Sequence, residues 1–251
     1  MFHVLNAAGF DVRVCNHAAA ILGGDFADET NALVGTLLNF KLSANGIIRS
    51  GGGQAKSTQH LRDELYKIGW VKHEFVVQMI VDGDEREARS HEVDHVHHGD
   101  NGTLALEIEW NNKDPFFDRD LENFQRLHAQ GAISVGVVVT RGASLQAALP
   151  SIVERALSSA GIQSVDTLED WGVKKRTDRQ MSQLAKLMEQ GVPFATAFAQ
   201  SFVADKFGTA TTHWSKLEDR VKRGVGNPCP LLLVGLPAAC VGDYSAATPE
   251  L

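Results

Sequence analysis

Two glutamates occupy alternate positions in a short apolar segment, Leu104 to Trp110, which reads Leu-Ala-Leu-Glu-Ile-Glu-Trp. The alternation predicts a β-strand whose apolar side chains face one side, while Glu107 and Glu109 face the other. Their backbone positions are about 7 Å apart in such a strand. Two carboxylates held side by side repel each other, which raises their pKa values unless a cation binds between them.

A third carboxylate, Asp94, precedes this segment on the strand that we expect to be its hairpin partner. Three carboxylates on two adjacent strands form an oxygen-lined site suited to Mg²⁺. A divalent cation held there can bind a phosphate oxygen and lower the pKa of a water molecule. We expect Asp94 and Glu107 to bind the metal, and Glu109 to orient or deprotonate the attacking water. The alternative is that Glu107 and Glu109 line a solvated face of the sheet.

The elements that must position these carboxylates follow from hydrophobic periodicity and turn residues. Asp82-Gly83 is a hairpin signal, and Asp114-Pro115 predicts the start of a helix with Asp114 as its N-cap. The predicted order is two hairpin strands, a third strand, this helix and a strand buried on both faces, at residues 73–81, 87–97, 103–110, 114–131 and 133–140. The last three elements predict a βαβ unit.

The rest of the chain predicts mainly helices and one more strand. The helices are expected at residues 27–42, 58–68, 145–160, 178–190 and 193–207, and the strand at 230–236. We therefore expect an α/β fold with a mixed sheet flanked by helices, in a single domain over residues 1–251. Its parts are an N-terminal helical segment (1–50), the sheet with its crossover (51–141), and a helical elaboration that carries a polar, basic segment and the last strand (142–251).

The carboxylate segment resembles the active site of a known enzyme superfamily. Asp94, followed by residues 107–117 (Glu-Ile-Glu-Trp-Asn-Asn-Lys-Asp-Pro-Phe-Phe), is similar to the motif of the PD-(D/E)XK nucleases. Glu109 stands where that motif usually has Lys, a departure typical of type II restriction endonucleases of the BglII and BamHI class. The resemblance extends to Gly51–Trp70 and Thr211–Trp214, so it covers roughly residues 50 to 236.

The resemblance implies a restriction-endonuclease-like fold and a sequence-specific, Mg²⁺-dependent hydrolysis of phosphodiester bonds in double-stranded DNA. A homodimer with two-fold symmetry would recognise a palindrome and cut both strands. The implied catalytic residues are Asp94, Glu107 and Glu109, with one or two Mg²⁺ ions per site, and the implied metal ligands are Asp94, Glu107 and Ile108.

Seven residues are predicted to contact DNA. Asn111 and Asn112 follow the glutamate strand, and an Asn amide can pair with an adenine edge or donate to a phosphate. Arg141 follows the buried strand at its carboxyl end, where ligands gather in α/β sheets. The complete set is Asn111, Asn112, Arg141, Ser144, Thr212, His213 and Lys56. The alternatives are a helix cap for Asn112 and solvated surface positions for Arg141 and for the basic segment 209–226.

Three histidines next to Asp94 leave a second chemistry open. His95, His97 and His98 could hold zinc in a hydrolase. Gly99 stands where the His-x-His-x-Asp-His signature of metallo-β-lactamase-like hydrolases has Asp, and strand alternation places His95 and His97 on the face opposite Asp94 and His98. A third hypothesis is a non-catalytic DNA-binding regulator with the same fold, in which the carboxylates play no role.

Charge and composition limit the classes of function. The chain has 24 Lys and Arg against 31 Asp and Glu, a formal net charge of −7. Proteins that coat DNA without sequence preference are usually basic, so DNA binding here requires a local basic cleft. No apolar run approaches the ~18 residues of a membrane span. Three separated cysteines disfavour disulfides and fit a reducing, cytoplasmic setting.

Overall fold

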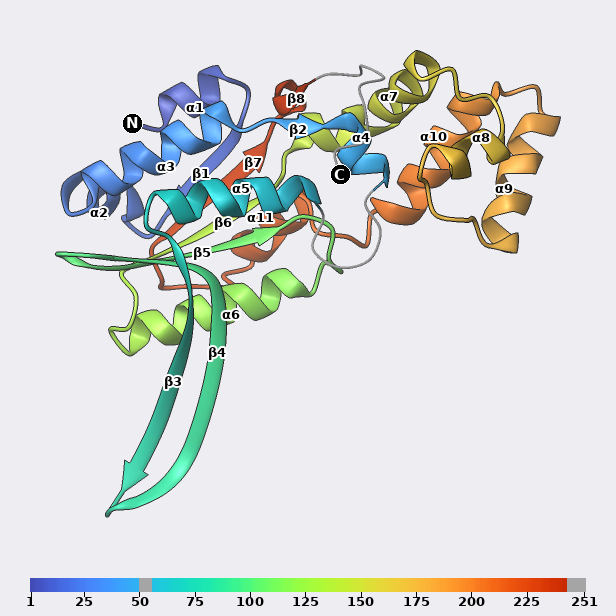
Figure 1. Ribbon diagram of the computed structural model, residues 1–251. Coiled ribbons are helices and arrows are strands. Elements are labelled where there is room, and N and C mark those ends of the chain that lie inside the picture. The colour runs from blue at the N-terminus through green and yellow to red at the C-terminus, as the bar shows by residue number, and fades with distance from the viewer. Residues whose placement is uncertain (50–55, 243–251) are drawn as a thin grey trace.

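A six-stranded mixed sheet forms the centre of the molecule in a computed structural model that describes residues 1–49 and 56–242, apart from the side chains of residues 56, 57, 79 and 85–89 (Figure 1). The strand order is β1-β7-β6-β5-β4-β3. The pairs β5–β6 and β6–β7 are parallel, whereas the pairs β1–β7, β3–β4 and β4–β5 are antiparallel. The bounds are Asp11–Cys15, Val71–Val81, Asp84–Gly99, Gly102–Glu109, Val135–Arg141 and Leu231–Leu236 for β1 and β3 to β7. The predicted α/β fold is confirmed.

The β5-α6-β6 unit forms because its three segments have strong and different periodicities. In β5 small and apolar residues alternate with the glutamates, whereas all seven residues of β6 are buried, as expected for a central parallel strand. The helix between them, α6 (Phe116–Ala129), buries one stripe that includes Phe117, Leu121 and Phe124. This stripe packs on the sheet and fixes the helix directly over the glutamate-bearing face of β5.

Helices cover both faces of the sheet and build two separate apolar cores. The smaller core lies between the sheet and α6 together with α11. The larger core lies on the opposite face and joins the N-terminal helices, α5 and the C-terminal helices α7 to α10. The helix bounds are His3–Ala7, Ala18–Gly24, Ala27–Asn39, Ala44–Arg49, Lys56–Lys67, Ala143–Ser159, Val165–Asp170, Asp178–Glu189, Phe194–Lys206 and Trp214–Lys222 for α1 to α5 and α7 to α11.

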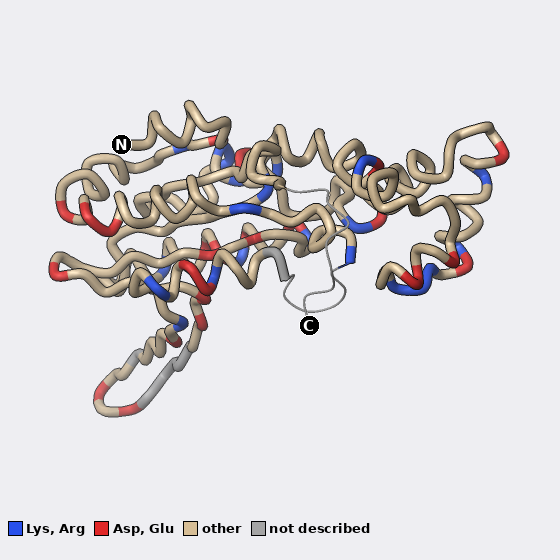
Figure 2. The backbone as a smooth tube through the Cα atoms, turned by 45° about the horizontal axis from the view of Figure 1, so that its top comes forward, with Lys and Arg blue, Asp and Glu red and all other residues tan. Residues whose placement is uncertain are grey.

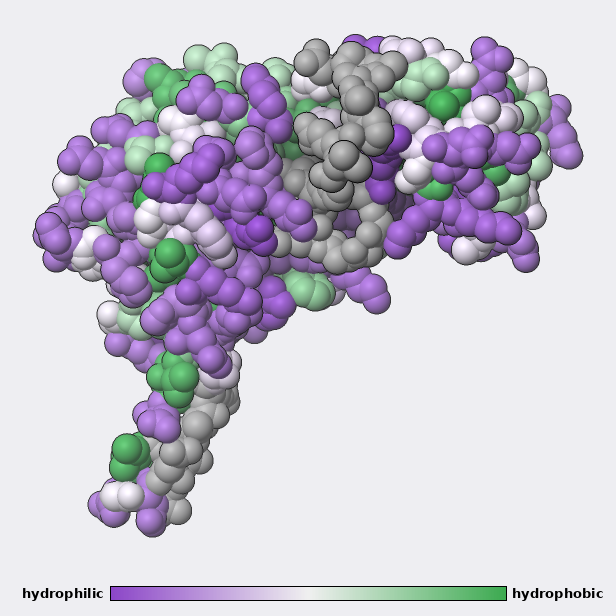
Figure 3. Space-filling model, viewed as in Figure 1, coloured by the Kyte–Doolittle hydropathy of each residue, from purple (hydrophilic) through white to green (hydrophobic). Residues whose placement is uncertain are grey.

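The β3–β4 hairpin projects from the body of the molecule (Figure 1). Within β4 only residues 95–99 pair with β5, so the part of the strand nearer the tip pairs with β3 alone. Its tip has Asp82 at φ 55° and Gly83 at φ 86°, the positive values that a two-residue hairpin turn requires. Val76 and Ile80 are exposed on this projection, where Figure 3 shows apolar side chains along β3.

Sequence patterns located the central elements and missed several short ones. The helices predicted at residues 27–42, 58–68, 145–160, 178–190 and 193–207 are present with slightly different ends, as are the hairpin, the βαβ unit and the last strand. The N-terminal strand β1 was not predicted. Neither were α1, α2, α4, α8, α11, the 3-10 turn Ala238–Cys240 and the small pair of β2 (Leu42–Ser43) with β8 (Val241–Gly242).

Candidate active site

Glu107 and Glu109 lie on the same face of β5, beneath α6. Each is almost fully buried, with 4% and 3% of its surface exposed. Ala105 shares this face and packs with the α6 core, whereas Leu104 and Leu106 belong to the core on the other side. The solvated-face alternative therefore does not describe these two carboxylates, because α6 covers the face from which they project.

Burial and mutual repulsion perturb both glutamates. Desolvation raises the pKa of Glu107 well above its usual value, and the charges of Asp120, Asp94 and Glu109 raise it further. Desolvation is also the largest cause at Glu109, whose pKa rises to about 8, followed by the charge of Asp120 and a hydrogen bond with its carboxyl group. A site of this kind has a strong negative potential, which a bound cation would relieve.

Asp120 and Arg119 of α6 complete the cluster and were not predicted. Asp120 is completely buried, and its Oδ1 accepts a hydrogen bond of 2.8 Å from Nε of Arg119 and forms an ion pair with Nη2 at 2.8 Å. The same Nη2 lies 3.7 Å from Oε1 of Glu109. A signal was present in the sequence, because Asp120 lies three residues after Phe117 and four before Phe124, within the apolar stripe of the helix. A charged residue in such a stripe needs a buried partner.

Asp94 reaches the cluster through an irregularity in β4. His73 pairs with Val93 and Val71 pairs with Val96, so three residues of β4 span two of β3, which defines a β-bulge around Asp94 and His95. As a result Val93 and Val96 both pack in the core under α6, although strict alternation would separate them. Asp94 is half-buried, and its charge raises the pKa values of both Glu107 and Asp120.

A histidine and an asparagine lie on the other side of Glu107. Nε2 of His91 is 4.0 Å from Oε1 of Glu107, and the side chain of Asn123 on α6 contacts the same imidazole ring at 2.9 Å. Burial and the charges of Arg119 and Arg126 lower the pKa of His91. His91 is therefore neutral at physiological pH, and it leaves the negative charge of Glu107 uncompensated on that side.

The donor set suits a hard cation, although its members are not gathered around one point. Among the described residues, no group of three or more His, Cys, Asp or Glu side chains is arranged to hold a metal ion. Glu107, Glu109 and Asp120 have pKa values raised mainly by desolvation and further by nearby carboxylates, and carboxylate oxygens are the ligands that Mg²⁺ prefers. The chemistry of the residues therefore fits Mg²⁺, with Asp94, Glu107 and Glu109 as the available oxygens.

Comparison with known families identifies the family of the chain. The family model for "Restriction endonuclease BglII/BglIII" matches residues 10–236. The chain belongs to the BglII/BglIII restriction endonuclease family. The match begins about 40 residues before the region in which the sequence motifs resemble these enzymes, so it includes β1 and the helices α2 to α4. No curated protein matches the sequence.

Membership of this family makes the chain a type II site-specific deoxyribonuclease that acts on double-stranded DNA. The family match favours neither the DNA-binding regulator nor the zinc hydrolase that the sequence left open. Among residues 1–49 and 56–242, no helix has both the length and the apolar character needed to cross a bilayer. Lys and Arg positions are interspersed with Asp and Glu positions over the part of the endonuclease that the structure describes (Figure 2).

The asparagines that follow β5 border the glutamates of this restriction endonuclease. Nδ2 of Asn112 donates to Oε2 of Glu109 at 2.9 Å, and the remainder of the Asn112 side chain is exposed. Oδ1 of Asn111 is buried without a hydrogen-bond partner in the described structure. The side chain of Ile108 packs against the opposite core, so only its carbonyl oxygen could bind a metal. Asn112 does not cap α6.

Asp114 also does not cap α6, contrary to the prediction. The helix begins at Phe116 after Pro115, which has helical backbone angles, and no side chain caps this end. Asp114 instead binds Arg220 at 3.1 Å and Lys216 at 3.4 Å. Two cations of the basic segment 209–226 are therefore paired with an acid next to α6, which reduces the positive charge this segment presents to DNA.

Arg141 lies inside the endonuclease and not at the rim where we expected it. Its side chain has no exposed surface and donates to the carbonyl of Thr212, to Oγ1 of Thr211 and to Oε1 of Gln146. Its guanidinium also lies 4.8 Å from the ring centre of Phe207. A side chain with these contacts cannot reach a base or a phosphate in this conformation, so Arg141 anchors the segment before α11 to the sheet.

The other predicted DNA contacts differ in accessibility. Thr212 is buried, and its amide donates to the carbonyl of Asn112 at 2.8 Å. His213 precedes α11 and is almost fully buried beside Ser215. Ser144 is exposed, and its hydroxyl accepts a hydrogen bond from the amide of Ala238. Lys56 begins α5, but its side chain lies outside the described residues, as do Gly51 to Gly53.

The histidine cluster lies on the face of the sheet opposite the glutamates. The ring of His95 contacts Tyr66 of α5, and the ring of His97 contacts Trp70, with ring centres 5.9 and 5.6 Å apart. His98 points elsewhere and bonds Thr103 at 3.1 Å. The separation of His95 and His97 from His98 agrees with the predicted alternation, and the three rings do not converge on a metal position.

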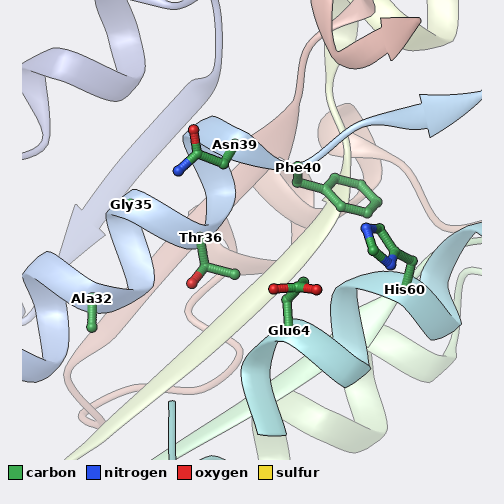
Figure 4. A pocket seen from close by; sticks show the side chains of 7 residues that line it. All are labelled: Ala32, Gly35, Thr36, Asn39, Phe40, His60 and Glu64. Atoms are coloured by element: carbon green, nitrogen blue, oxygen red, sulfur yellow. The ribbon is translucent and has the colours of Figure 1, made fainter. Parts of the chain in front are cut away.

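A pocket of about 500 Å³ lies between α3 and α5, on the face of the sheet that α6 does not cover (Figure 4). Its lining combines small residues of α3 with polar residues of α5, namely Ala32, Gly35, Thr36, Asn39, Phe40, His60 and Glu64. None of the predicted catalytic or DNA-contacting residues is among them. The pocket is therefore separate from the carboxylate site.

Proposed function

We propose that this restriction endonuclease hydrolyses phosphodiester bonds at a palindromic site in double-stranded DNA, in a Mg²⁺-dependent reaction carried by Asp94, Glu107 and Glu109. The observation that carries the proposal is the burial of Glu107 and Glu109 on one face of β5. Desolvation and the charges of neighbouring carboxylates raise the pKa values of both. Unpaired buried carboxylates are costly, and they persist where a cation or a proton serves a function.

The proposed roles follow from the positions of the side chains. Asp94 and Glu107 would hold the metal, and the carbonyl of Ile108 lies between the two glutamates in the sequence. Bound Mg²⁺ would supply positive charge to the phosphate and a more acidic water. Glu109 would accept a proton from the attacking water, because a carboxylate of raised pKa is a stronger base at neutral pH. Asn112, bonded to Glu109, would hold its carboxylate in place.

The homodimer is part of the same proposal. One active site cuts one strand, and a palindromic duplex presents two equivalent strands related by a two-fold axis. Two copies of the chain related by that axis would place one carboxylate site at each scissile phosphate. Asn111 and Asn112 would lie toward the DNA, where an Asn amide can bind an adenine edge or a phosphate.

The decisive experiment uses a plasmid of known sequence, incubated with the protein in Mg²⁺ or in EDTA. We expect discrete fragments in Mg²⁺ alone, whose ends reveal a palindromic site. Glu107→Gln should lose cleavage by at least about 100-fold while it still binds a duplex that contains the site. Glu122→Gln is the matched control, because Glu122 is exposed on α6 away from the cluster.

Three outcomes would contradict the proposal. Cleavage in EDTA would show that the reaction does not require a metal. Full activity of Glu107→Gln would show that the reaction does not require the carboxylate site. A molar mass of one chain for the protein bound to its duplex, measured by sedimentation, would exclude the homodimer.

A further inference from the structure

The carboxylate cluster has one cationic side chain at its solvent edge, Arg119. Its side chain is 50% exposed, whereas those of Glu109 and Asp120 beneath it are 4% and 0% exposed. Any ligand that approaches the carboxylates from solvent on this side meets the guanidinium before it meets them. The position is set by α6, whose first turn carries Phe116 and Arg119.

Two contacts hold the guanidinium in a fixed orientation. Nε donates to Oδ1 of Asp120 at 2.8 Å, Nη2 forms an ion pair with the same oxygen at 2.8 Å, and the guanidinium carbon lies 4.4 Å from the ring centre of Phe116. Nη1 has no hydrogen-bond partner among the described residues. An Arg that uses one edge for a buried carboxylate and keeps donors on another is pre-organised to bind a second anion.

The anion that the site must receive is a phosphodiester. A DNA strand carries one negative charge per phosphate, and the buried carboxylates repel it. Asp120, Asp94 and Glu109 each raise the pKa of Glu107, and Asp120 raises that of Glu109, so negative charge at this position is unfavourable without a cation. A guanidinium 3.7 Å from Glu109 is placed to offset that repulsion at the phosphate to be cut.

From this arrangement we infer that Arg119 is a catalytic residue that binds the scissile phosphodiester, or one of the two phosphates adjacent to it, through Nη1. The inference rests on the proposed function, because it assigns a ligand to an additional residue of the same site. It also gives Asp120 a positioning role, since Asp120 holds Arg119 through Nε and Nη2 while it contacts Glu109.

The test is a binding cycle in EDTA with duplexes that contain the cleavage site. Each duplex carries a single uncharged methylphosphonate at the scissile phosphate or at either neighbour. We expect one of these substitutions to weaken binding of the wild-type protein by about tenfold or more, the value of one charge-assisted contact. The same substitution should change binding of Arg119→Ala by less than about twofold, because the contact is already absent.

Three further variants separate this role from a structural one. Arg119→Lys keeps the charge, so it should recover part of the coupling and of the single-turnover rate in Mg²⁺. Arg119→Ala alone would leave the buried carboxylate of Asp120 without its cation and could destabilise the fold. The double variant Arg119→Ala/Asp120→Asn removes that carboxylate, so it separates loss of the contact from misfolding. Arg179→Ala is the control, because Arg179, on the distant helix α9, is an exposed arginine that also pairs with an aspartate, Asp205 of α10.

The outcomes distinguish this inference from the proposed function. Suppose that the wild-type protein cuts its site, but that each methylphosphonate weakens duplex binding by the wild-type protein and by Arg119→Ala to the same extent. The inference is then wrong and the proposed function stands. If the wild-type protein neither binds nor cuts a defined site, the proposed function fails and the inference fails with it.

Discussion

Glu109 and Asp120 meet as two buried carboxyl groups across the contact between β5 and α6. A hydrogen bond joins them, which requires a proton on one of the two groups. Desolvation raises the pKa of both groups, to about 8 at Glu109, which therefore keeps its proton at neutral pH. The metal-free site therefore keeps a proton at neutral pH that a bound cation would displace.

The protonation of Glu109 predicts how stability depends on pH without metal. The pKa of Glu109 is about 8 in the folded state, whereas the ordinary value for Glu, which applies to the unfolded chain, is 4.5. Between pH 4.5 and 8 the folded protein therefore binds more protons than the unfolded chain. Stability contributed by this group is present below pH 4.5 and is lost as pH rises through 8. We expect the melting temperature in EDTA to fall between pH 6.5 and 8, and Mg²⁺ to raise it more at pH 8 than at pH 6.5.

Asp120→Asn tests the origin of that effect. The variant removes the neighbouring charge, so the pKa of Glu109 should fall and the decline in melting temperature between pH 6.5 and 8 should become shallower. Glu122→Gln, on the exposed side of the same helix, should follow the wild-type curve. A steeper decline in Asp120→Asn than in the wild type would contradict the assignment.

His95 predicts a second pH effect, with the opposite sign. Burial lowers its pKa to about 4 from 6.5, so the unfolded chain binds the additional proton between these values. Stability from this group is complete above pH 6.5 and decreases as pH falls toward 4, by at most about 3 kcal/mol. Urea unfolding in EDTA should show a smaller acid-induced loss in His95→Gln than in the wild type, whereas His98→Gln, at an exposed position, should show none of this change.

Arg141 should be a determinant of stability. Arg141→Ala removes donors from the carbonyl of Thr212 and from Gln146, and it leaves a cavity beside Phe207. We expect a loss of about 3 kcal/mol or more in the free energy of unfolding by urea. Arg155→Ala, on the surface of α7, should change it by less than about 0.5 kcal/mol. An unchanged stability with lost DNA binding would instead support the contact with DNA that the sequence suggested.

Local patterns were sufficient where neighbouring residues decide the structure. The alternation of Leu104 to Trp110 determined that Glu107 and Glu109 share one face, because the side-chain period of a strand is two residues. The Asp82-Gly83 turn and the stripe of Phe117, Leu121 and Phe124 determined the hairpin and the helix in the same way. Such periodicities depend on the chain within a few residues, so they can be recognised without coordinates.

Tertiary structure decided what depends on residues far apart in the chain. Strand β1 is held by the pairing of Asp11–Cys15 with β7, more than 200 residues later, since the alternation of Val12 and Val14 with charged residues extends over only five residues. The burial of Arg141, the pairing of Asp114 with Arg220 and the approach of Asp120 to Glu109 arise in the same way. The sequence alone determined that Glu107 and Glu109 share one face, whereas long-range packing of α6 and α11 decided which charges surround them, because burial and charge pairing are set by the whole fold.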